Sequence, residues 1–262
     1  MHMTVKTKEE LTEWVLGSPC LWLFLDYDGT LAEFAPTPEH IEPNQEIIDV
    51  LEQLVRRPCT RVTILSGRRL DHVRQLLPVP GLFLAGTYGL EFTEPTGATV
   101  RRVEYKDIRP AMEAIRPQWQ QLIEGRNGFF LEDKGWTLAL HARFAEDQEA
   151  EQVLTRARRL TSQVSPVSRF RILGGHKFLE IAPRRANKRD TVAYLLSRYP
   201  LNEARLLYIG DDDKDEEAFP LIHANQGLAV KVLQPSQAVN ATTADFFFES
   251  TSETLGWLKG LV

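Results

Sequence analysis

Short apolar runs alternate with amphipathic stretches along much of this 262-residue chain. Residues 21–25 form a continuous apolar run, residues 43–57 carry apolar side chains at helical spacing, and residues 62–65 are again apolar. A continuously apolar strand is typical of a parallel sheet that helices cover on both faces. We therefore expect an α/β protein built around a mainly parallel sheet.

The middle of the chain has a different order of predicted elements. Between Tyr105 and Pro183 the pattern indicates helix, strand, strand, helix, strand, strand. That order favours a small α+β module with an antiparallel sheet, inserted into the host fold. We therefore predict a core domain formed by residues 1–104 and 184–262, and an inserted domain formed by residues 105–183.

Composition limits the classes of partner. The chain has 36 acidic and 31 basic side chains, for a formal net charge of −5. Nucleic acids and anionic membranes call for a concentrated basic surface, so neither is an expected partner. There is no 18-residue apolar span and no secretory leader pattern, so we expect a cytoplasmic protein. Cys20 and Cys59 lack metal-ligand spacing, and we expect two unpaired small hydrophobic side chains in a reducing compartment.

Two carboxylates, Asp26 and Asp28, directly follow the apolar run at residues 21–25. In open α/β sheets, ligands bind beyond the carboxyl ends of the strands. Neighbouring carboxylates repel each other unless a cation compensates, and Mg²⁺ is an ion that prefers oxygen ligands. On this motif alone, a cation site and an ordinary Asp-Gly turn are both open.

A second acidic segment, residues 211–217, follows the apolar run at residues 206–209. It holds six acids and one lysine, so its local charge of −5 equals the net charge of the whole chain. A calcium EF-hand loop is excluded, because its sixth position, which needs Gly, is Glu216, and its twelfth, which needs Glu, is Ile222. A cation site and a solvated acidic loop remain.

Two further motifs suit a phosphate. Ser66, Gly67 and Arg68 follow a predicted strand and precede a predicted helix at residues 69–77, so a hydroxyl and backbone N–H groups lie at a helix N-terminus. Asn187 is a predicted N-cap, and Lys188 places a positive charge at the start of the next helix. Each motif alone is equally explained by an ordinary cap or a solvated lysine.

The order of these four motifs along the chain resembles the haloacid dehalogenase superfamily, with the insert in the place of that superfamily's C2-type cap. The likeness to trehalose-6-phosphate phosphatases is closer and covers roughly residues 20–250. It is carried by residues 25–31, 64–68, 85–91 and 210–216. The resemblance implies a Rossmann-like parallel core with an inserted αββαββ cap.

The resemblance also implies a chemistry: Mg²⁺-dependent hydrolysis of trehalose 6-phosphate through an aspartyl-phosphate. Asp26 would be the nucleophile and Asp28 the general acid and base. Mg²⁺ would be held by Asp26, the Asp28 carbonyl and Asp211. The phosphoryl oxygens would be bound by Gly29, Thr30, Ser66, Gly67 and Lys188, the last also counted as catalytic. Asp212 or Asp215 would orient metal-bound waters or Lys188.

In the insert, five charged side chains resemble the cap residues that hold the distal sugar of the substrate. These are Glu132, Lys134, Arg143, Lys177 and Glu180. Charged groups that alternate along strands can make many hydrogen bonds to a polyol. The alternative is a charged solvent face of an antiparallel sheet.

Three departures from the family pattern leave the exact sugar open. Tyr88 stands where His is frequent, Arg189 where Gly is common, and Lys214 where Thr is usual. The alternatives are a phosphatase for sucrose phosphate or a glycosyl phosphoglycerate, and a catalytically silent sugar-phosphate-binding domain. A phosphorylated receiver domain does not fit, because it needs no insert and is about half this length. The expected partners are a small-molecule sugar phosphate and a sugar-phosphate synthase of the same pathway.

Overall fold

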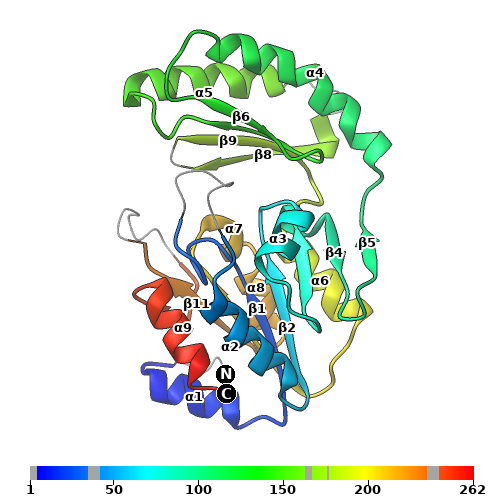
Figure 1. Cartoon of the computed structure of the whole chain (residues 1–262), viewed down its shortest axis with the longest axis vertical. Coiled ribbons are helices and arrows are strands. Elements are labelled where there is room, and N and C mark those ends of the chain that lie inside the picture. Colours follow the sequence, from blue (N-terminus) through cyan, green and yellow to red (C-terminus); the bar gives the residue numbers. More distant parts are fainter. Residues whose placement is uncertain (1–4, 35–41, 163–166, 176, 235–241) are drawn as a thin grey trace. The chain divides into compact units, whose positions relative to one another are not determined.

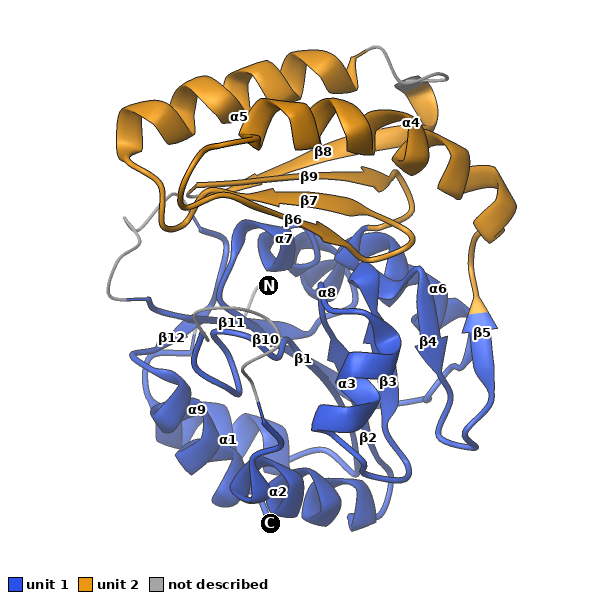
Figure 2. Cartoon of the chain, turned by 45° about the horizontal axis from the view of Figure 1, so that its top comes forward, with its two compact units in different colours: residues 1–100, 187–262 blue, residues 101–186 orange. Residues whose placement is uncertain are grey.

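The computed structural model describes residues 5–34, 42–162, 167–175, 177–234 and 242–262. The chain divides into two compact units (Figure 2). The first comprises residues 1–100 and 187–262, and the second comprises residues 101–186. The predicted α/β class is confirmed. Among the residues that the structure describes, no helix has the length and apolar character needed to cross a membrane.

The first unit is built on an eight-stranded sheet in the order β12-β11-β10-β1-β2-β3-β4-β5. The six strands from β12 to β3 pair in parallel, and β4 pairs with β3 in the antiparallel sense. The bounds are β1 (Cys20–Leu25), β2 (Thr60–Leu65), β3 (Phe83–Gly86), β4 (Glu91–Thr93), β5 (Thr99–Arg101), β10 (Ala204–Gly210), β11 (Leu228–Val232) and β12 (Phe246–Phe248).

Helices cover both faces of this sheet (Figure 1). One face packs against α1 (Lys8–Leu16), α2 (Gln45–Arg56), α3 (Leu70–Leu76) and α9 (Thr251–Lys259). The other packs against α6 (Lys188–Arg198) and α8 (Phe219–Ala224), and the short α7 (Asp213–Glu216) follows β10. Alternate side chains of β1 serve the two faces: Leu23 joins the first core, and Trp22 and Phe24 join the second. This two-sided burial explains why the strand is apolar throughout.

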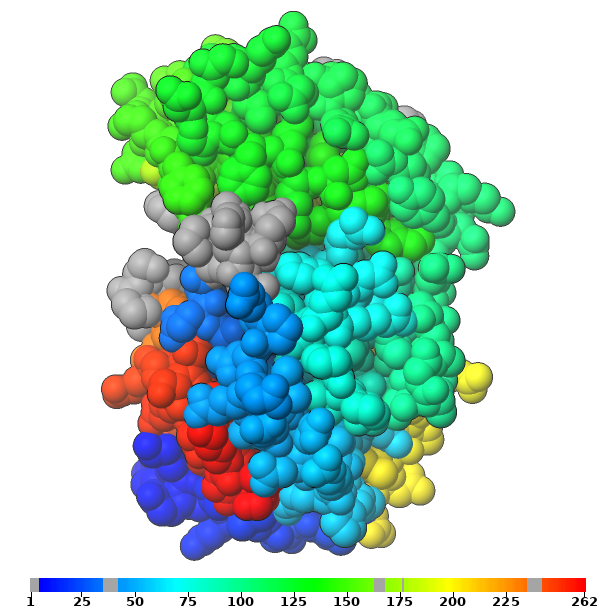
Figure 3. All heavy atoms as spheres, viewed as in Figure 1, coloured from blue at the N-terminus to red at the C-terminus, as the bar shows by residue number. Residues whose placement is uncertain are grey.

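The first and last helices of the chain are neighbours. Lys8 of α1 pairs with Glu253 of α9 at 2.7 Å, and the Trp257 indole donates to the Thr12 hydroxyl at 2.9 Å. Figure 3 shows the corresponding dark-blue and red segments in contact on the surface. The sequence analysis did not predict α1, whose buried side chains are only Leu11, Trp14 and Val15.

The second unit has a four-stranded antiparallel sheet in the order β6-β7-β9-β8. Its helices α4 (Tyr105–Ile123) and α5 (Asp147–Thr161) pack against each other and lie on the same side of the sheet (Figure 1). The strands are β6 (Phe130–Asp133), β7 (Leu138–His141), β8 (Phe170–Gly175) and β9 (Phe178–Pro183). The predicted helix-strand-strand-helix-strand-strand order is therefore confirmed.

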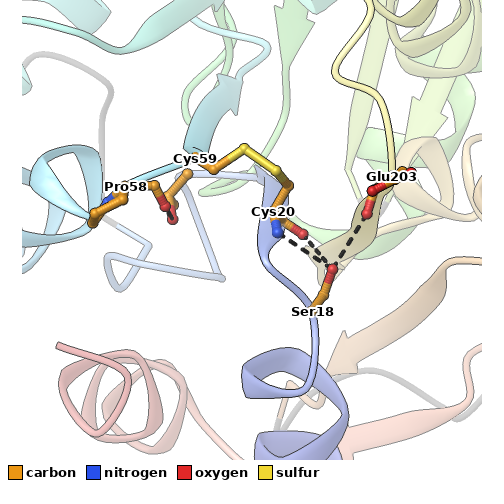
Figure 4. The surroundings of a disulfide bond; sticks show 6 residues. Ser18, Cys20, Pro58, Cys59 and Glu203 are labelled. Atoms are coloured by element: carbon orange, nitrogen blue, oxygen red, sulfur yellow. Dashed lines mark hydrogen bonds between the residues drawn. A yellow bond between two sulfur atoms is a disulfide. The ribbon is translucent and has the colours of Figure 1, made fainter.

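The prediction of two unpaired cysteines was wrong, because Cys20 and Cys59 form a disulfide (Figure 4). Leu21 pairs with Thr60 across the parallel strands, and the Leu21 amide donates to the Cys59 carbonyl at 3.0 Å. This register brings the two Cα atoms to 4.7 Å although 39 positions separate the residues in sequence. Ser18 lies beside the bond, and its hydroxyl donates to the Cys20 carbonyl.

Candidate active site

The carboxyl ends of three adjacent strands carry the predicted chemical groups. In the order β10-β1-β2, Leu25 is level with both Ile209 and Ile64. The residues that continue these strands therefore emerge at one edge of the sheet. Asp26 follows β1, and its amide donates to the Ile209 carbonyl at 3.0 Å. Ser66 follows β2, and the acidic segment that starts at Asp211 follows β10.

A buried lysine joins two carboxylates at this edge. The Lys188 Nζ lies 2.9 Å from Asp26 Oδ2 and donates to Asp215 Oδ1 at 2.7 Å. The Tyr208 hydroxyl donates to the same Asp215 oxygen at 2.7 Å. All four side chains are buried. Lys188 reaches this position because α6 begins there, with Asn187 as the predicted N-cap accepting a bond from the Asp190 amide. No motif in the sequence indicates this role for Tyr208.

The ionisation of this cluster follows from burial and pairing. Burial alone would lower the pKa of Lys188, but Asp215 and Asp26 raise that pKa well above its ordinary value. Burial raises the pKa of Asp26 well above its ordinary value, and Lys188 opposes the shift only in part. Lys188 therefore stays positively charged, and Asp26 favours the approach of a further cation.

A bidentate ion pair holds Asp28. Arg68 donates from Nε to Asp28 Oδ2 at 2.7 Å and from Nη2 to Oδ1 at 2.6 Å. The Arg68 amide donates to the Ser66 hydroxyl at 3.1 Å, and its Nη1 lies 3.2 Å from His72 Nδ1. Arg68 is 9% exposed and the Asp28 side chain 22%. The guanidinium therefore fixes both oxygens of Asp28 at a partly open position, a role that the sequence analysis did not assign.

The loop after β1 packs closely on Asp211. Gly29 has a φ of +75°, and a Cβ there would lie 2.4 Å from Asp211 Oδ2, so only glycine fits. The Thr30 hydroxyl lies at 3.5 Å from the other oxygen, Oδ1. Asp211 Oδ2 is buried and makes no hydrogen bond to any described residue. Burial, with Asp26 adding to it, raises the pKa of Asp211 well above its ordinary value.

The donor set fits a hard divalent cation. Asp26, Asp212 and Asp215 each place an oxygen within 4.8 Å of the others. The cation already among them is the Lys188 ammonium, which contacts Asp26 and Asp215. Unlike those carboxylates, Asp211 has a buried oxygen, Oδ2, without a hydrogen bond to any described residue. Burying such an oxygen without a partner costs free energy, which a bound cation would offset. Carboxylate oxygens are the ligands that Mg²⁺ prefers, so Asp211 and Asp26 could hold it.

Asp212 is the N-cap residue of α7. Its side chain accepts bonds from the amides of Lys214 and Asp215, which completes a capping box. Its Oδ2 also lies 2.9 Å from Lys214 Nζ. Burial would raise the pKa of Asp212, but Lys188 and Lys214 outweigh it and hold the pKa below its ordinary value. Lys214, a departure from the family pattern, thus stabilises the Asp212 carboxylate.

Tyr88, another departure, packs against the predicted phosphate-binding motif at Ser66 and Gly67. It lies in the short helix η2 (Thr87–Gly89) with a φ of +56°. Its amide donates to the Ser66 carbonyl at 2.9 Å, and its carbonyl accepts from the Thr191 hydroxyl at 2.9 Å. A Cβ at Gly67 would lie 2.9 Å from the Tyr88 ring, so the glycine makes room for it. Arg189, the third departure, is exposed.

In the second unit, three of the five predicted sugar-binding residues form a cluster. Glu132 and Glu180 both face Ala139 across the β6-β7-β9 register. The small side chain of Ala139 leaves room above it, and Lys134 Nζ lies 3.2 Å from Glu180 Oε1 and 3.9 Å from Glu132 Oε2. His141, which the sequence analysis did not include, lies 3.0 Å from Glu132 Oε2. Glu180 is fully buried.

The other two predicted residues lie elsewhere in the unit. Lys177 Nζ donates to the Ala145 carbonyl at 2.6 Å and pairs with Asp147, the first residue of α5. It lines a pocket of about 360 Å³ together with side chains of α5. Arg143 follows β7 and is exposed. The ammonium of Lys177 therefore lies at the start of α5, where it contacts Asp147.

A sequence profile described as "Trehalose-phosphatase" matches residues 24–252 of the chain. The chain belongs to the trehalose-phosphatase family. This confirms the resemblance expected from the four motifs. The chain is 32% identical over 221 residues to a "Probable trehalose-phosphate phosphatase" of Sinorhizobium fredii, covering 84% of this chain and 80% of the relative.

Two further comparisons give the extent of the likeness. The chain is 30% identical over 232 residues to a "Trehalose-phosphate phosphatase" of Mycobacterium marinum, covering 87% of this chain and 58% of that relative. The chain therefore spans less than two thirds of the mycobacterial protein. The solved C-terminal domain of the C. albicans trehalose-6-phosphate phosphatase superposes with a TM-score of 0.86 at 21% identity, covering 100% of this chain and 99% of that one. That superposition establishes the likeness of the folds.

Proposed function

We propose that this chain hydrolyses trehalose 6-phosphate to trehalose and phosphate. The observation that carries the proposal is the family match over residues 24–252, combined with the place of Asp26 and Asp211 after two adjacent strands and the contact of Lys188, at the start of α6, with Asp26. Such an edge is where α/β sheets bind ligands. A cytoplasmic location and a sugar-phosphate synthase as partner stay predictions of the sequence analysis.

The proposed reaction has two displacements at phosphorus. In the first, an Asp26 oxygen bonds to phosphorus while the bond from phosphorus to the sugar oxygen breaks, and Asp28 gives its proton to that sugar oxygen. In the second, Asp28 takes a proton from a water that attacks phosphorus, which releases phosphate and restores the Asp26 carboxylate. Arg68 holds the ionised Asp28 carboxylate through both oxygens, which is the form that takes the proton from water.

The remaining residues of the first unit would bind the charged phosphoryl group and the metal ion. The backbone and side chains of Gly29, Thr30, Ser66 and Gly67 would bind the phosphoryl oxygens, and Lys188 would contribute its positive charge. Mg²⁺, held by Asp26, the Asp28 carbonyl and Asp211, would reduce the repulsion between a carboxylate and a phosphate dianion. Asp215 keeps Lys188 oriented through their 2.7 Å bond.

We propose that the second unit is the cap that selects the sugar. Glu132 and Lys134 are 19% and 7% exposed, so they can exchange some of their present contacts for sugar hydroxyls. The buried Glu180 would position Lys134 from below. Arg143 and Lys177 would contribute only from outside this cluster, as their positions at the ends of β7 and β9 imply.

The test measures phosphate release and compares kcat/KM for trehalose 6-phosphate, sucrose phosphate, a glycosyl phosphoglycerate and an aryl phosphate, each with Mg²⁺. Lys134→Gln should lower kcat/KM for trehalose 6-phosphate by about tenfold or more, since one charged hydrogen bond is lost, and should spare the aryl phosphate. The matched control is Lys106→Gln, an exposed lysine of α4, which should change neither.

Four outcomes would contradict parts of the proposal. Preference for another glycosyl phosphate would overturn the substrate, and the absence of turnover on every ester would favour a silent binding domain. Equal loss on both substrates in Lys134→Gln would make Lys134 structural. Phosphatase activity that survives EDTA would overturn the metal assignment, and binding of Mg²⁺ by calorimetry, lost in Asp211→Asn, tests it without turnover.

A further inference from the structure

The second unit contains a basic pocket that the proposed reaction does not use. Its volume is about 480 Å³, and all the residues that line it fall within residues 101–186. Its charged lining consists of Arg101, Arg102, Arg169, Arg184, Arg185, Glu104 and Asp107. Five guanidinium groups face two carboxylates, in a chain whose overall charge is negative. The pocket therefore concentrates positive charge where composition alone predicts none.

Hydrogen bonds to two backbone carbonyls bring these arginines together. Arg184 directly follows β9, and its amide donates to the Arg169 carbonyl at 2.9 Å. Arg185 donates from Nη1 to the Arg102 carbonyl at 2.9 Å. The pairing of Phe170 with Pro183 in the β8-β9 ladder keeps the first of these contacts in register. The cluster thus arises where the chain enters and leaves the second unit.

The chemistry of the lining defines the ligand class. Guanidinium groups bind phosphate oxygens through paired hydrogen bonds, and a cluster of them favours an anionic ligand. Arg169 already lies 3.7 Å from Asp107, and both side chains are about half exposed, so that pair is open to exchange. Glu104 and Asp107 can accept hydrogen bonds from ligand hydroxyls.

We propose that this pocket binds a small molecule that carries two linked phosphates, at a site that shares no residue with the proposed active site. Its volume lies within the range of roughly 300–1,000 Å³ that is typical of small-molecule sites. The excess of arginine over acid favours a ligand with several negative charges. The two carboxylates favour a diphosphate ester with hydroxyl groups over bare pyrophosphate.

Calorimetry on the full chain in EDTA tests the proposal with two probes, inorganic pyrophosphate and ADP. The variant is Arg169→Gln with Arg184→Gln, which removes two pocket charges and leaves the Arg185 contact with Arg102 in place. The control is Arg156→Gln with Arg159→Gln, two exposed arginines of α5 outside the pocket. We expect ADP to bind more tightly than pyrophosphate, a Kd at least tenfold higher in the pocket variant, and less than twofold change in the control.

Three results would overturn the proposal. These are no binding of either probe to the wild-type chain at millimolar concentration, equal loss in the two double variants, and tighter binding of an oligoglutamate peptide than of ADP. The last would assign the pocket to an acidic protein segment. Thermal unfolding of both variants checks that they are folded. Because binding is measured without substrate, the result is independent of the proposed phosphatase reaction.

Discussion

We expect Arg68 to position Asp28. Replacing Arg68 should therefore lower catalysis without weakening the binding of the sugar. Its guanidinium makes two bonds to the Asp28 carboxylate, at 2.6 and 2.7 Å. Arg68→Gln removes the charge and the paired geometry. Arg68→Lys keeps the charge but cannot make the bidentate contact. The neighbouring Arg69 is exposed, so Arg69→Gln is a matched control.

The size of the effect follows from these two bonds. A hydrogen bond to a charged group contributes about 1.5–3 kcal/mol, so two such bonds give at least about 3 kcal/mol. Asp28 is 22% exposed, and water replaces part of what is lost. We therefore expect a loss of about 2 kcal/mol in the transition state, which is roughly a 30-fold fall in kcat.

The assay is steady-state phosphate release from trehalose 6-phosphate and from an aryl phosphate. Arg68→Gln should lower kcat for both substrates by the same factor, because the proposed role of Asp28 is at the phosphoryl end, and should leave KM within about threefold. Arg68→Lys should fall between this variant and the wild type. A folded Arg68→Gln variant that keeps kcat within twofold of the wild type, or that loses activity on the sugar phosphate alone, would refute the positioning role of Arg68.

Two predictions concern stability. Opening the disulfide between Cys20 and Cys59, which closes a loop of 39 positions, should cost about 4 kcal/mol and lower Tm by about 10 °C. Calorimetric scans with and without dithiothreitol measure this, and an unchanged Tm would contradict it. Burial favours the neutral form of Asp133, but hydrogen bonds from Arg109 and the Gly135 amide outweigh it and lower the pKa. The ion pair between Arg109 and Asp133 therefore stabilises the folded chain above about pH 4, and this stabilisation is lost as pH falls further and Asp133 is protonated. Asp133→Asn should lower Tm by about 3 °C at pH 7 and by progressively less as pH falls through the lowered pKa, and a difference that does not shrink with falling pH would contradict this.

Much of the fold could be predicted because its strands are buried on both faces. The apolar run that became β1 supplies Leu23 to one core and Trp22 and Phe24 to the other, so its pattern indicates a central parallel strand. The same rule placed Asp26 and Asp211 at one edge, since both follow such strands. Helix α1 was missed because only a few of its side chains are buried, which leaves a weak periodic signal.

The features that sequence reasoning missed depend on register between distant segments. Cys20 and Cys59 are adjacent only because Leu21 pairs with Thr60. The bond between Arg68 and Asp28 joins the ends of two strands, and no spacing in the sequence encodes it. A local signal did exist for Arg68, because it directly follows the Ser-Gly pair that was already singled out.

In the insert, too, the arrangement of the charged side chains depends on strand register. Strand alternation places Glu132 and Glu180 on one face with Ala139 between them, and that pattern is readable once the register is known. Likeness to the family predicts that Lys177 joins them in binding the sugar, and that stays a prediction. In the structure its ammonium contacts Asp147 at the start of α5, which no pattern in the sequence indicates.

The central claim is that Asp26 is the nucleophile of a trehalose 6-phosphate phosphatase reaction. The most direct measurement is kcat for phosphate release from trehalose 6-phosphate with Mg²⁺, for the wild-type chain and for Asp26→Asn. The amide is nearly isosteric and can still accept a bond from Lys188, so the variant should fold with a Tm close to that of the wild type. We predict that its kcat falls by at least about 10⁴-fold, since no covalent intermediate can form. A folded Asp26→Asn variant with kcat within tenfold of the wild type would contradict the claim.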